Sequence, residues 1–468
     1  MLKIIQAIND VTWGWLLSII LLAFGIFILI RNRAPQFRFF GKMWKNIATS
    51  TKAAEENGVS GFGVLCSALG SLIGTGTLVG TATAVMSGGP GAVFWMWIVC
   101  LLAMGISFGE TILAQISRDK DTEGTYCGGA PYYIAKLLKQ PKLGVVYSVC
   151  MFVTIGFCYM MLQSNSISQA VSGVVDVNPW IVGVIVMILS FAVVIGGLKR
   201  LTSITSYIVP FMAVAYIVCA LIVIIANYKN IPAVFASIFT SAFTGKAAAG
   251  GIAGYSIQQA FRYGVARGMF SNDCGTGCTG SLNAGAEVKH PVEQGLAAMV
   301  GIFIVTTIIC TITALSILLT GAMATGDVGI QLTQAAFESV LGKTGRWIIT
   351  IAMFLFAYTS LIADVYLGEV NLNYLAKKNK NVKIWIYRVA AAIMCVVGAV
   401  ISLDSMWALI DFTIAFMIVI NLYALFRLNG QVRYVIKDYD TQIKNGVERP
   451  VWDFDRDLSV LPDQEENE

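Results

Sequence analysis

Residues 70–85 read GSLIGTGTLVGTATAV, an apolar stretch long enough to lie within a bilayer but interrupted at its centre by Gly74, Thr75, Gly76 and Thr77. A helix that crosses hydrocarbon must satisfy its backbone N–H and C=O groups internally, and glycines weaken it where it should be strongest. Free peptide groups at that depth are tolerated where they line a polar cavity. The stretch therefore predicts a membrane span that is unwound at its midpoint to form a binding site.

The composition indicates an all-α, polytopic membrane protein. Of the 468 residues, 57% are hydrophobic and 13% are charged, whereas a soluble domain usually carries about 25% charged residues. With about twenty apolar residues required for each span, the sequence predicts eleven membrane helices. They cover residues 11–31, 59–87, 90–117, 144–175, 179–197, 204–227, 247–270, 292–321, 345–375, 383–402 and 405–428.

The basic residues predict how these helices are oriented. If the 31–58 segment is cytoplasmic, the inside segments hold 27 of the 32 lysines and arginines, as the positive-inside rule requires. We therefore expect a multi-pass protein of the prokaryotic plasma membrane, in contact with lipid, whose N-terminus is outside and whose 430–468 tail is cytoplasmic. The net charge of +5 comes from short clusters between apolar runs, which argues against nucleic-acid binding.

A second interruption is expected in the seventh span, around Gly250, Gly251 and Gly254. Five predicted helices follow from each break, so the two units enter the membrane from opposite sides, which is typical of an inverted repeat. This pattern divides the chain into an N-terminal helix and connector (1–58), a first repeat (59–228), a second repeat (229–429) and the tail. The alternative is that the glycines only permit close helix packing.

Several longer motifs together resemble the alanine or glycine:cation symporters, also called sodium:alanine symporters. The similarity runs through nearly the whole chain and is carried by GTGTLVGTATAV (74–85), GGPGAVFWMW (88–97), GGAPYYI (128–134), QSNS (163–166), GGLKRLTSI (196–204), RYGVARGMFSND (262–273) and KHPVEQGLAAM (289–299). The resemblance implies a LeuT-like fold with one extra N-terminal helix before ten core helices. It also implies sodium-coupled uptake of a small neutral amino acid by alternating access, and we expect the carrier to function as a monomer.

The resemblance assigns roles to particular residues. The unwound Gly74, Thr75 and Gly76 would offer backbone N–H groups to the substrate carboxylate, since a helix N-terminus favours an anion. The side-chain amide of Gln163 would bind the ammonium or the carboxylate. The predicted substrate site is completed by Gly251, Ser360 and Asp364.

A sodium site is also implied, in which carbonyls of the first core helix face hydroxyls of the eighth. Its predicted members are Gly70, Ile73, Phe356, Thr359 and Ser360, all of which offer uncharged oxygens, the ligands that a hard cation prefers. The alternative for the two hydroxyl residues is a hydrogen bond to the preceding turn of their own helix.

Asp364 departs from the family, which carries a tryptophan there that walls the substrate pocket. A buried membrane aspartate costs several kcal/mol unless it is paired or hydrated, so it is a functional candidate. It could pair the substrate ammonium, hold a second cation or titrate in proton coupling, unless it lies in a hydrated cytoplasmic vestibule. A carrier for a larger or more cationic amino acid, coupled to another cation or to H⁺, therefore stays open. The sequence also departs at Thr77, where the family has asparagine, and in CGTGCTGSLNAGAE (274–287), which we read as an altered cytoplasmic junction.

Other intramembrane polar residues favour structural roles. We expect Glu110 to make a structural hydrogen bond or to line a water-filled gap. Asp411 with Asn421 is expected to anchor helix packing, and His290 to cap the helix that starts at Pro291.

An enzyme is disfavoured because the predicted spans carry no histidine, no Gly-x-Ser-x-Gly elbow and no acidic-pair motif. A passive channel is the remaining alternative. One central site between inverted repeats favours alternating access over a continuous pore.

Overall fold

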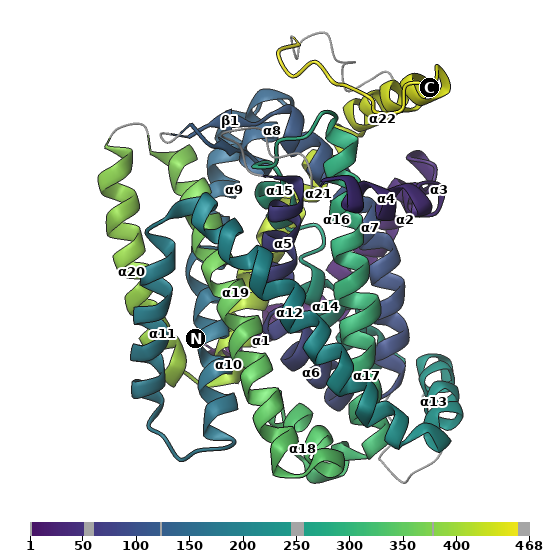
Figure 1. Ribbon diagram of the computed structural model, residues 1–468, viewed down its shortest axis with the longest axis vertical. Helices are drawn as coiled ribbons and strands as arrows, with labels where there is room; N and C mark the ends of the chain where they lie inside the picture. The colour runs from purple at the N-terminus through teal and green to yellow at the C-terminus, as the bar shows by residue number, and fades with distance from the viewer. Residues whose placement is uncertain (1, 51–59, 122–123, 245–256, 377–378, 457–468) are drawn as a thin grey trace.

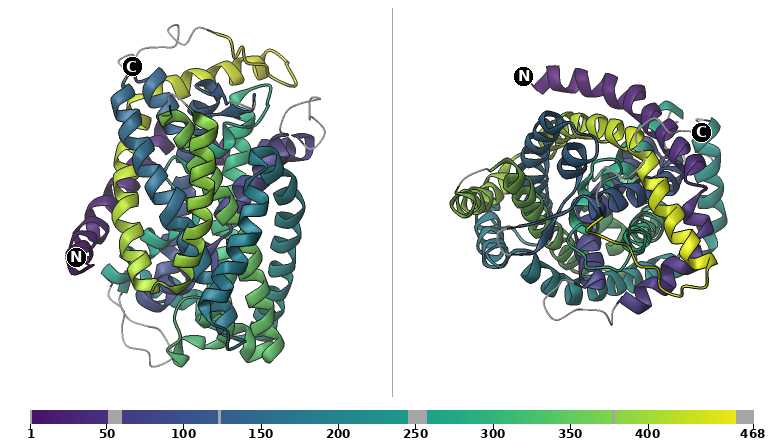
Figure 2. Two further views of the ribbon diagram at one scale, coloured as in Figure 1. Left: turned by 90° about the vertical axis from the view of Figure 1, so that its left-hand side faces the viewer. Right: turned by 90° about the horizontal axis from the view of Figure 1, so that it is seen from above.

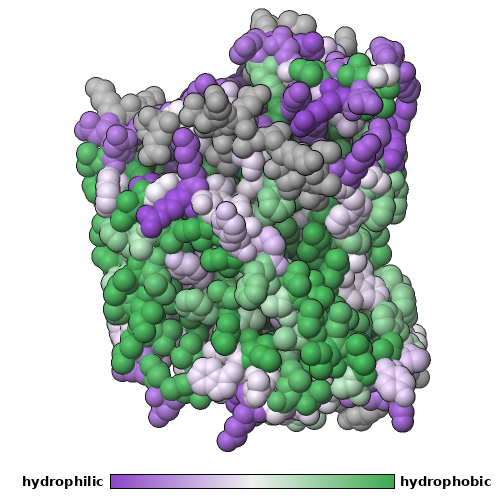
Figure 3. Space-filling view, viewed as in Figure 1, coloured by the Kyte–Doolittle hydropathy of each residue, from purple (hydrophilic) through white to green (hydrophobic). Residues whose placement is uncertain are grey.

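The computed structural model describes residues 2–50, 60–121, 124–244, 257–376 and 379–456. Within these residues the chain is almost entirely helical, and its only sheet is a two-stranded antiparallel hairpin of β1 (Asp119–Lys120) and β2 (Tyr126–Cys127). The helices run mostly along one axis (Figure 1), and on the face seen in Figure 3 apolar side chains form a broad band across the middle, with polar ones toward both ends. This is the arrangement expected of a protein whose middle section lies in the membrane and contacts lipid.

Seven described helical segments are long and apolar enough to cross a membrane. They are α7 (Gly91–Ile116), Pro141–Ser172, α12 (Gly197–Ala226), Pro291–Thr320, α19 (Lys343–Leu375), α20 (Lys380–Val400) and α21 (Leu403–Arg427). Pro141–Ser172 comprises α9 (Pro141–Val153), the π-helical turn η3 (Thr154–Tyr159) and α10 (Met160–Ser172). Pro291–Thr320 comprises α16 (Pro291–Ile302), the π-helical turn η5 (Phe303–Cys310) and α17 (Thr311–Thr320).

An eighth span is bent by 46° between Gly61–Leu72 and Gly76–Gly88. Its parts are α5 (Gly61–Leu72), the π-helical turn η2 (Gly76–Gly80) and α6 (Thr81–Gly88). Two shorter apolar helices, α2 (Leu17–Arg31) and α11 (Pro179–Val194), coincide with further predicted spans. The hydropathy pattern therefore located these segments, although α12 starts seven residues before its predicted boundary because a helix can extend beyond its apolar run.

Additional helices lie outside the predicted spans. At the N-terminus, α1 (Leu2–Val11) precedes the first predicted span, which consists of the π-helical turn η1 (Thr12–Leu16) and α2. The connector forms α3 (Pro35–Arg38) and α4 (Phe40–Ser50). Other short helices are α8 (Ala130–Lys136), η4 (Tyr228–Asn230), α13 (Ile231–Thr244), η6 (Ala322–Thr325), α18 (Ile330–Leu341) and α22 (Asn429–Lys444) in the tail. In Figure 1, α8, β1 and α22 lie at one end of the molecule and α13 and α18 at the other, while both views of Figure 2 place the N-terminal helix at the periphery.

The predicted second break, around Gly250, Gly251 and Gly254, lies outside the described residues. Helix α14 (Ile257–Asn272) is continuous, and a described break follows it, before the short α15 (Cys278–Asn283). Three residues there have positive φ, Asp273 (50°), Gly275 (75°) and Gly277 (87°). The helix therefore ends within the stretch that the sequence marks as departing from the family, at residues whose backbone conformation is left-handed.

The structural roles expected for three polar residues can be compared with their contacts. Glu110 accepts a hydrogen bond of 2.6 Å from the Asn421 amide, as expected. Asp411 pairs with Arg267 at 2.8 Å instead of acting with Asn421. His290 caps α16, since its Nδ1 accepts from the Val292 N–H at 3.2 Å.

Candidate functional site

The break between α5 and η2 is stabilised by backbone hydrogen bonds of its own residues and by contacts with α19. Helix α5 starts with Ser60 as its N-cap and ends at Ile73, a fully buried residue whose N–H still bonds Leu69. The carbonyl of Gly74 accepts from the N–H and hydroxyl of Thr77, at 3.1 and 2.7 Å. A Cβ on Gly74 would lie 2.2 Å from Ser360 Oγ, so only glycine allows this close approach.

Gln163 on α10 joins the first break to α19. Its Oε1 accepts from the Thr75 N–H at 3.0 Å and from the Thr75 hydroxyl at 2.6 Å. The same side chain lies beside the carboxyl group of Asp364. The structure thus brings together three of the predicted substrate residues, Thr75, Gln163 and Asp364, all of them buried.

The predicted sodium residues also meet. Ser360 Oγ donates to the carbonyls of Gly70 and Ser71, both at 2.8 Å. Thr359 Oγ1 lies 3.2 Å from Gly70 O and 3.0 Å from Phe356 O. The back-bonding alternative therefore holds only in part, because Thr359 contacts both its own helix and α5, whereas both hydrogen bonds of Ser360 go to α5.

The chemistry of this cluster fits a small hard cation. Gly70, Ser71 and Phe356 contribute carbonyl oxygens and Thr359 and Ser360 contribute hydroxyls, all in a buried site. An entering cation would take the place of the hydroxyl protons as the partner of the carbonyls. Oxygen ligands without a full charge suit a monovalent ion that must also be released.

Asp364 is buried, with 2% of its surface exposed, which argues against the hydrated vestibule. Asp273, 5% exposed, is an acidic side chain close enough to repel it, and Tyr159 lies near both. Within the described residues, Asp364 Oδ2 and Asp273 Oδ1 have no hydrogen-bond partner. Two neighbouring buried carboxylates with unused oxygens make this the most electronegative part of the site.

The second break lies against the first. A Cβ on Gly76 would lie 2.9 Å from the Cα of Ser271, near the end of α14. The Tyr147 hydroxyl of α9 donates to the carbonyl of Thr276 within the break. Our prediction missed Asp273 and Thr276, although GTG at 275–277 repeats the GTG at 74–76 and is the signal that could have located them.

An aromatic wall covers one side of the site and was also missed. The Phe270 ring lies 4.9 Å from that of Tyr159 and 4.7 Å from that of Trp407 on α21. The guanidinium of Arg267 stacks 3.9 Å above the Trp407 ring while it pairs with Asp411. Because the cation is already paired, it fixes the wall and does not neutralise the two carboxylates.

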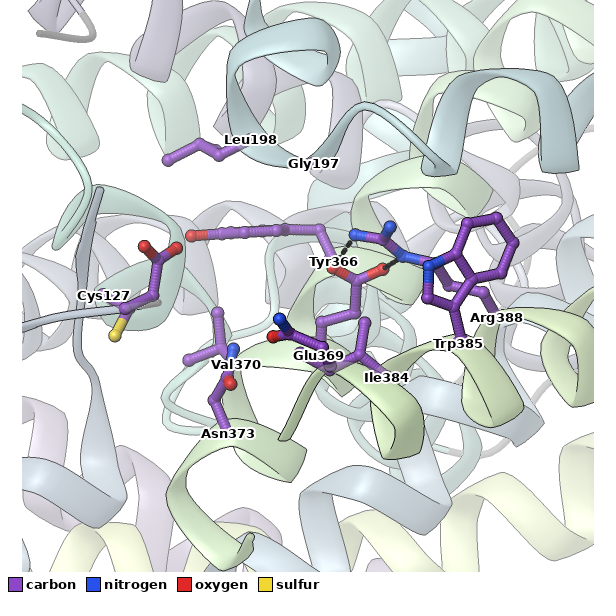
Figure 4. A pocket seen from close by; sticks show the side chains of 12 residues that line it. Cys127, Gly197, Leu198, Tyr366, Glu369, Val370, Asn373, Ile384, Trp385 and Arg388 are labelled. Atoms are coloured by element: carbon purple, nitrogen blue, oxygen red, sulfur yellow. Dashed lines mark hydrogen bonds and ion pairs between the residues drawn. The ribbon is translucent and has the colours of Figure 1, made fainter. Parts of the chain in front are cut away.

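A polar cavity of about 200 Å³ lies farther along α19 toward the hairpin end (Figure 4). It is lined by Tyr366, Glu369 and Asn373 of α19 and by Arg388 of α20. Glu369 and Arg388 form a bidentate ion pair at 2.6 and 2.8 Å, and both are at least 92% buried. The pair lies a little more than one turn of α19 beyond Asp364, between the central site and this end of the protein.

The sequence profile described as the sodium:alanine symporter family matches residues 1–453. The chain belongs to this family. It is 37% identical over 449 residues to the amino-acid carrier protein AlsT of Bacillus subtilis. This match covers 95% of the chain and 94% of AlsT. It is 36% identical over 444 residues to the probable sodium/glutamine symporter GlnT of Bacillus subtilis (95% and 91% covered) and 34% identical over 453 residues to the sodium/alanine symporter AgcS of Methanococcus maripaludis (95% and 98% covered).

Family membership confirms the resemblance drawn from the motifs and makes the chain a multi-pass membrane transporter of an amino-acid symporter family. The names of these relatives differ in the amino acid, glutamine for one and alanine for another. The family therefore fixes the type of transport and leaves the substrate to the residues of the site.

Proposed function

We propose that this chain is a secondary active transporter that couples the entry of Na⁺ to the uptake of a small neutral amino acid. The observation that carries the proposal is the pair of α19 hydroxyls, Thr359 and Ser360, in contact with the Gly70 carbonyl beside an unwound span. The substrate carboxylate would bind the N–H groups of the Gly74–Gly76 segment, with Gln163 as the side-chain ligand. Gly251 stays a predicted ligand outside the described residues.

The architecture belongs to the same proposal. Beside the eight long or bent spans of the described residues, α2, α11 and α14 would be three further spans, which would give the eleven predicted. We propose that they form an N-terminal helix followed by two LeuT-like repeats, 59–228 and 229–429. The breaks at Gly74–Gly76 and Asp273–Gly277 would be the corresponding points of the two repeats. The orientation, with the N-terminus outside and the tail in the cytoplasm, and the monomeric state are part of this proposal.

A second candidate is a carrier for a larger or more cationic amino acid. Asp364 favours it, because this carboxylate stands next to Gln163 where the family carries a tryptophan. Its negative charge adds to that of Asp273. A substrate with an additional amino group would supply the positive charge that this pair lacks among the described residues. H⁺ as the coupling ion rests on the same two carboxylates.

The test is uptake into proteoliposomes with sodium and pH gradients imposed independently. A sodium gradient alone should concentrate labelled alanine, whereas a pH gradient alone should not. Accumulation driven only by the pH gradient would refute sodium coupling, and equilibration without accumulation would indicate a channel.

Competition separates the two substrate candidates. Unlabelled glycine, alanine and serine should compete with labelled alanine if the first proposal holds. Stronger competition by 2,3-diaminopropionate or lysine, lost in Asp364→Asn, would establish the second. If Asp364→Trp leaves the ranking of competitors unchanged, Asp364 does not select the substrate.

A further inference from the structure

A basic cavity of about 430 Å³ lies where the end of α2 meets the tail helix α22. Figure 1 shows α2, α3 and α22 together at this end of the molecule, far from the central site. Six cationic side chains line the cavity: Arg31, Arg33, Arg38, Arg433, Lys437 and Lys444. They come from segments about 400 residues apart in the sequence, so the fold, and not one basic run, brings them together.

Among the described residues, little negative charge faces the cavity. Asp440 is the one carboxylate of the described lining, and it pairs with Arg38 at 2.8 Å. Within the described residues, Arg33, Arg433 and Lys437 form no ion pair. Cations that converge without counter-charges repel one another, and an anion bound among them would remove that cost.

A second observation also points to a ligand. Asn32, between two of the arginines, is 3% exposed and lines the cavity, yet neither its Oδ1 nor its Nδ2 has a hydrogen-bond partner within the described residues. A buried amide without partners costs about 1–3 kcal/mol. Its Nδ2 can donate to an anion and its Oδ1 can accept from a hydroxyl.

The cavity is at the level where the apolar surface ends. Arg31 is the last residue of α2, and the neighbouring Ile26 and Ile30 are 49% and 69% exposed. On the adjacent α21, Phe426 is 55% exposed and its ring lies 5.1 Å from that of Phe27. Exposed apolar side chains directly beside a basic cavity suit a molecule with a charged head and hydrocarbon chains.

We infer that this cavity binds the headgroup of an anionic phospholipid, whose acyl chains lie along the exposed apolar side chains of α2 and α21. Arginine forks match phosphate oxygens bidentately, and hydroxyl groups of the headgroup would reach the Asn32 amide. The lipid would tie the N-terminal helix to the tail, joining two segments that lie outside the proposed repeats. A free phosphate would use the cations but would gain nothing from the apolar surface.

The test compares two triple variants of the full chain. Arg33→Gln/Arg433→Gln/Lys437→Gln removes three charges from the cavity. Lys142→Gln/Lys199→Gln/Lys383→Gln removes three exposed charges elsewhere. Native mass spectrometry of the detergent-purified proteins would measure the binding of phosphatidylglycerol, of phosphatidylcholine with the same chains, and of inorganic phosphate.

We expect the wild type to bind phosphatidylglycerol at least tenfold more tightly than phosphatidylcholine. The cavity variant should lose about a hundredfold in affinity for the anionic lipid and the control variant less than threefold. If the cavity variant does not fold, the wild type alone still tests the inference, since raising the salt concentration about tenfold should weaken phosphatidylglycerol binding selectively. Equal losses in both variants, equal binding of both lipids, or displacement of the lipid by millimolar phosphate would overturn it.

Discussion

Replacing Gly74 by alanine tests the sodium site with a single methyl group. The new Cβ would lie 2.2 Å from Ser360 Oγ and 2.9 Å from Ser360 Cβ, so the serine side chain must move. It would then lose its one hydroxyl hydrogen bond, which the Gly70 and Ser71 carbonyls share at 2.8 Å each. At about 1 kcal/mol for that bond, with about 1 kcal/mol for an off-rotamer side chain, the cost is about 2 kcal/mol.

This cost falls on the stability of the ion-free protein. Moving Ser360 away also removes a hydroxyl ligand from the cation, and a loss of about 2 kcal/mol in ion binding corresponds to about thirtyfold in an equilibrium constant. Gly74→Ala should therefore raise the half-saturating sodium concentration by between about ten- and a hundredfold. Gly80→Ala is the matched control, because Gly80 lies in the same segment and its Cβ would meet nothing closer than 3.9 Å. The assay is alanine uptake into proteoliposomes over a range of external sodium, with the melting temperature of each variant measured in detergent.

A double variant separates the steric clash from the loss of a ligand. Gly74→Ala/Ser360→Gly removes both serine atoms that the new methyl group would meet and leaves Gln163 Oε1, at 3.0 Å, as its close contact. It should recover most of the loss in melting temperature but retain weak sodium dependence, because the hydroxyl is gone. If Gly74→Ala folds normally and its half-saturating sodium concentration stays within threefold of that of Gly80→Ala, Ser360 is not a sodium ligand and the reasoning fails.

Three further variants test other parts of the structure. Asp364→Asn should lower the apparent affinity for cationic amino acids more than tenfold in competition assays and change that for alanine less than threefold; equal effects on both would argue against a charge-selective role. Arg388→Met leaves the Glu369 carboxylate buried without its cation and should destabilise the protein by about 3–5 kcal/mol in thermal unfolding, whereas adding Glu369→Leu should recover most of the loss; a single variant as stable as the wild type would contradict this. Burial lowers the pKa of His290 to about 4 from 6.5 despite its Asp438 partner, so the folded state favours the neutral ring. The contribution of the buried neutral ring to stability is therefore complete above pH 6.5 and is lost as the pH falls toward 4. His290→Asn should therefore flatten the dependence of the melting temperature on pH between 6.5 and 4, and an unchanged dependence would assign the effect to other groups.

The positions of the long spans could be predicted because hydropathy is a property of each segment alone. Transfer of an apolar run into hydrocarbon needs no knowledge of its neighbours. Helices such as α13, α18 and α22 were missed for the same reason, since they are short and their stability depends on the surfaces against which they pack. The hydropathy pattern therefore gave the fold class and most boundaries, and omitted the helices at the two ends of the molecule.

The break at Gly74–Gly76 was predictable and the one at Asp273–Gly277 was not, although both contain a Gly-Thr-Gly sequence. At Gly74–Gly76 the glycines interrupt a long apolar run and are conspicuous. At Gly275–Gly277 they follow a polar stretch, where glycine usually indicates a loop at the membrane surface. Only the backbone conformation of Asp273 and its neighbours, with positive φ at the end of a buried helix, distinguishes the two cases.

Side-chain partners were the least predictable part. That Gln163 would lie near Thr75 followed from the resemblance to the family. The pairing of Arg267 with Asp411, and the approach of Asp273 to Asp364, depend on how α14 and α19 are placed in space, and no local pattern encodes that. The substitution at position 364 could be read from the sequence, but its neighbour could not.

The contacts of α19 explain why sodium and substrate would bind together. Ser360 donates to the Gly70 carbonyl near the end of α5. Asp364, one turn farther along the same helix, lies beside Gln163, which accepts from Thr75. Both proposed sites therefore use successive turns of α19 and opposite sides of one break. An ion that fixes α19 against α5 would also fix the segment that receives the substrate. Because such coupling is reciprocal, the amino acid would strengthen sodium binding by the same factor.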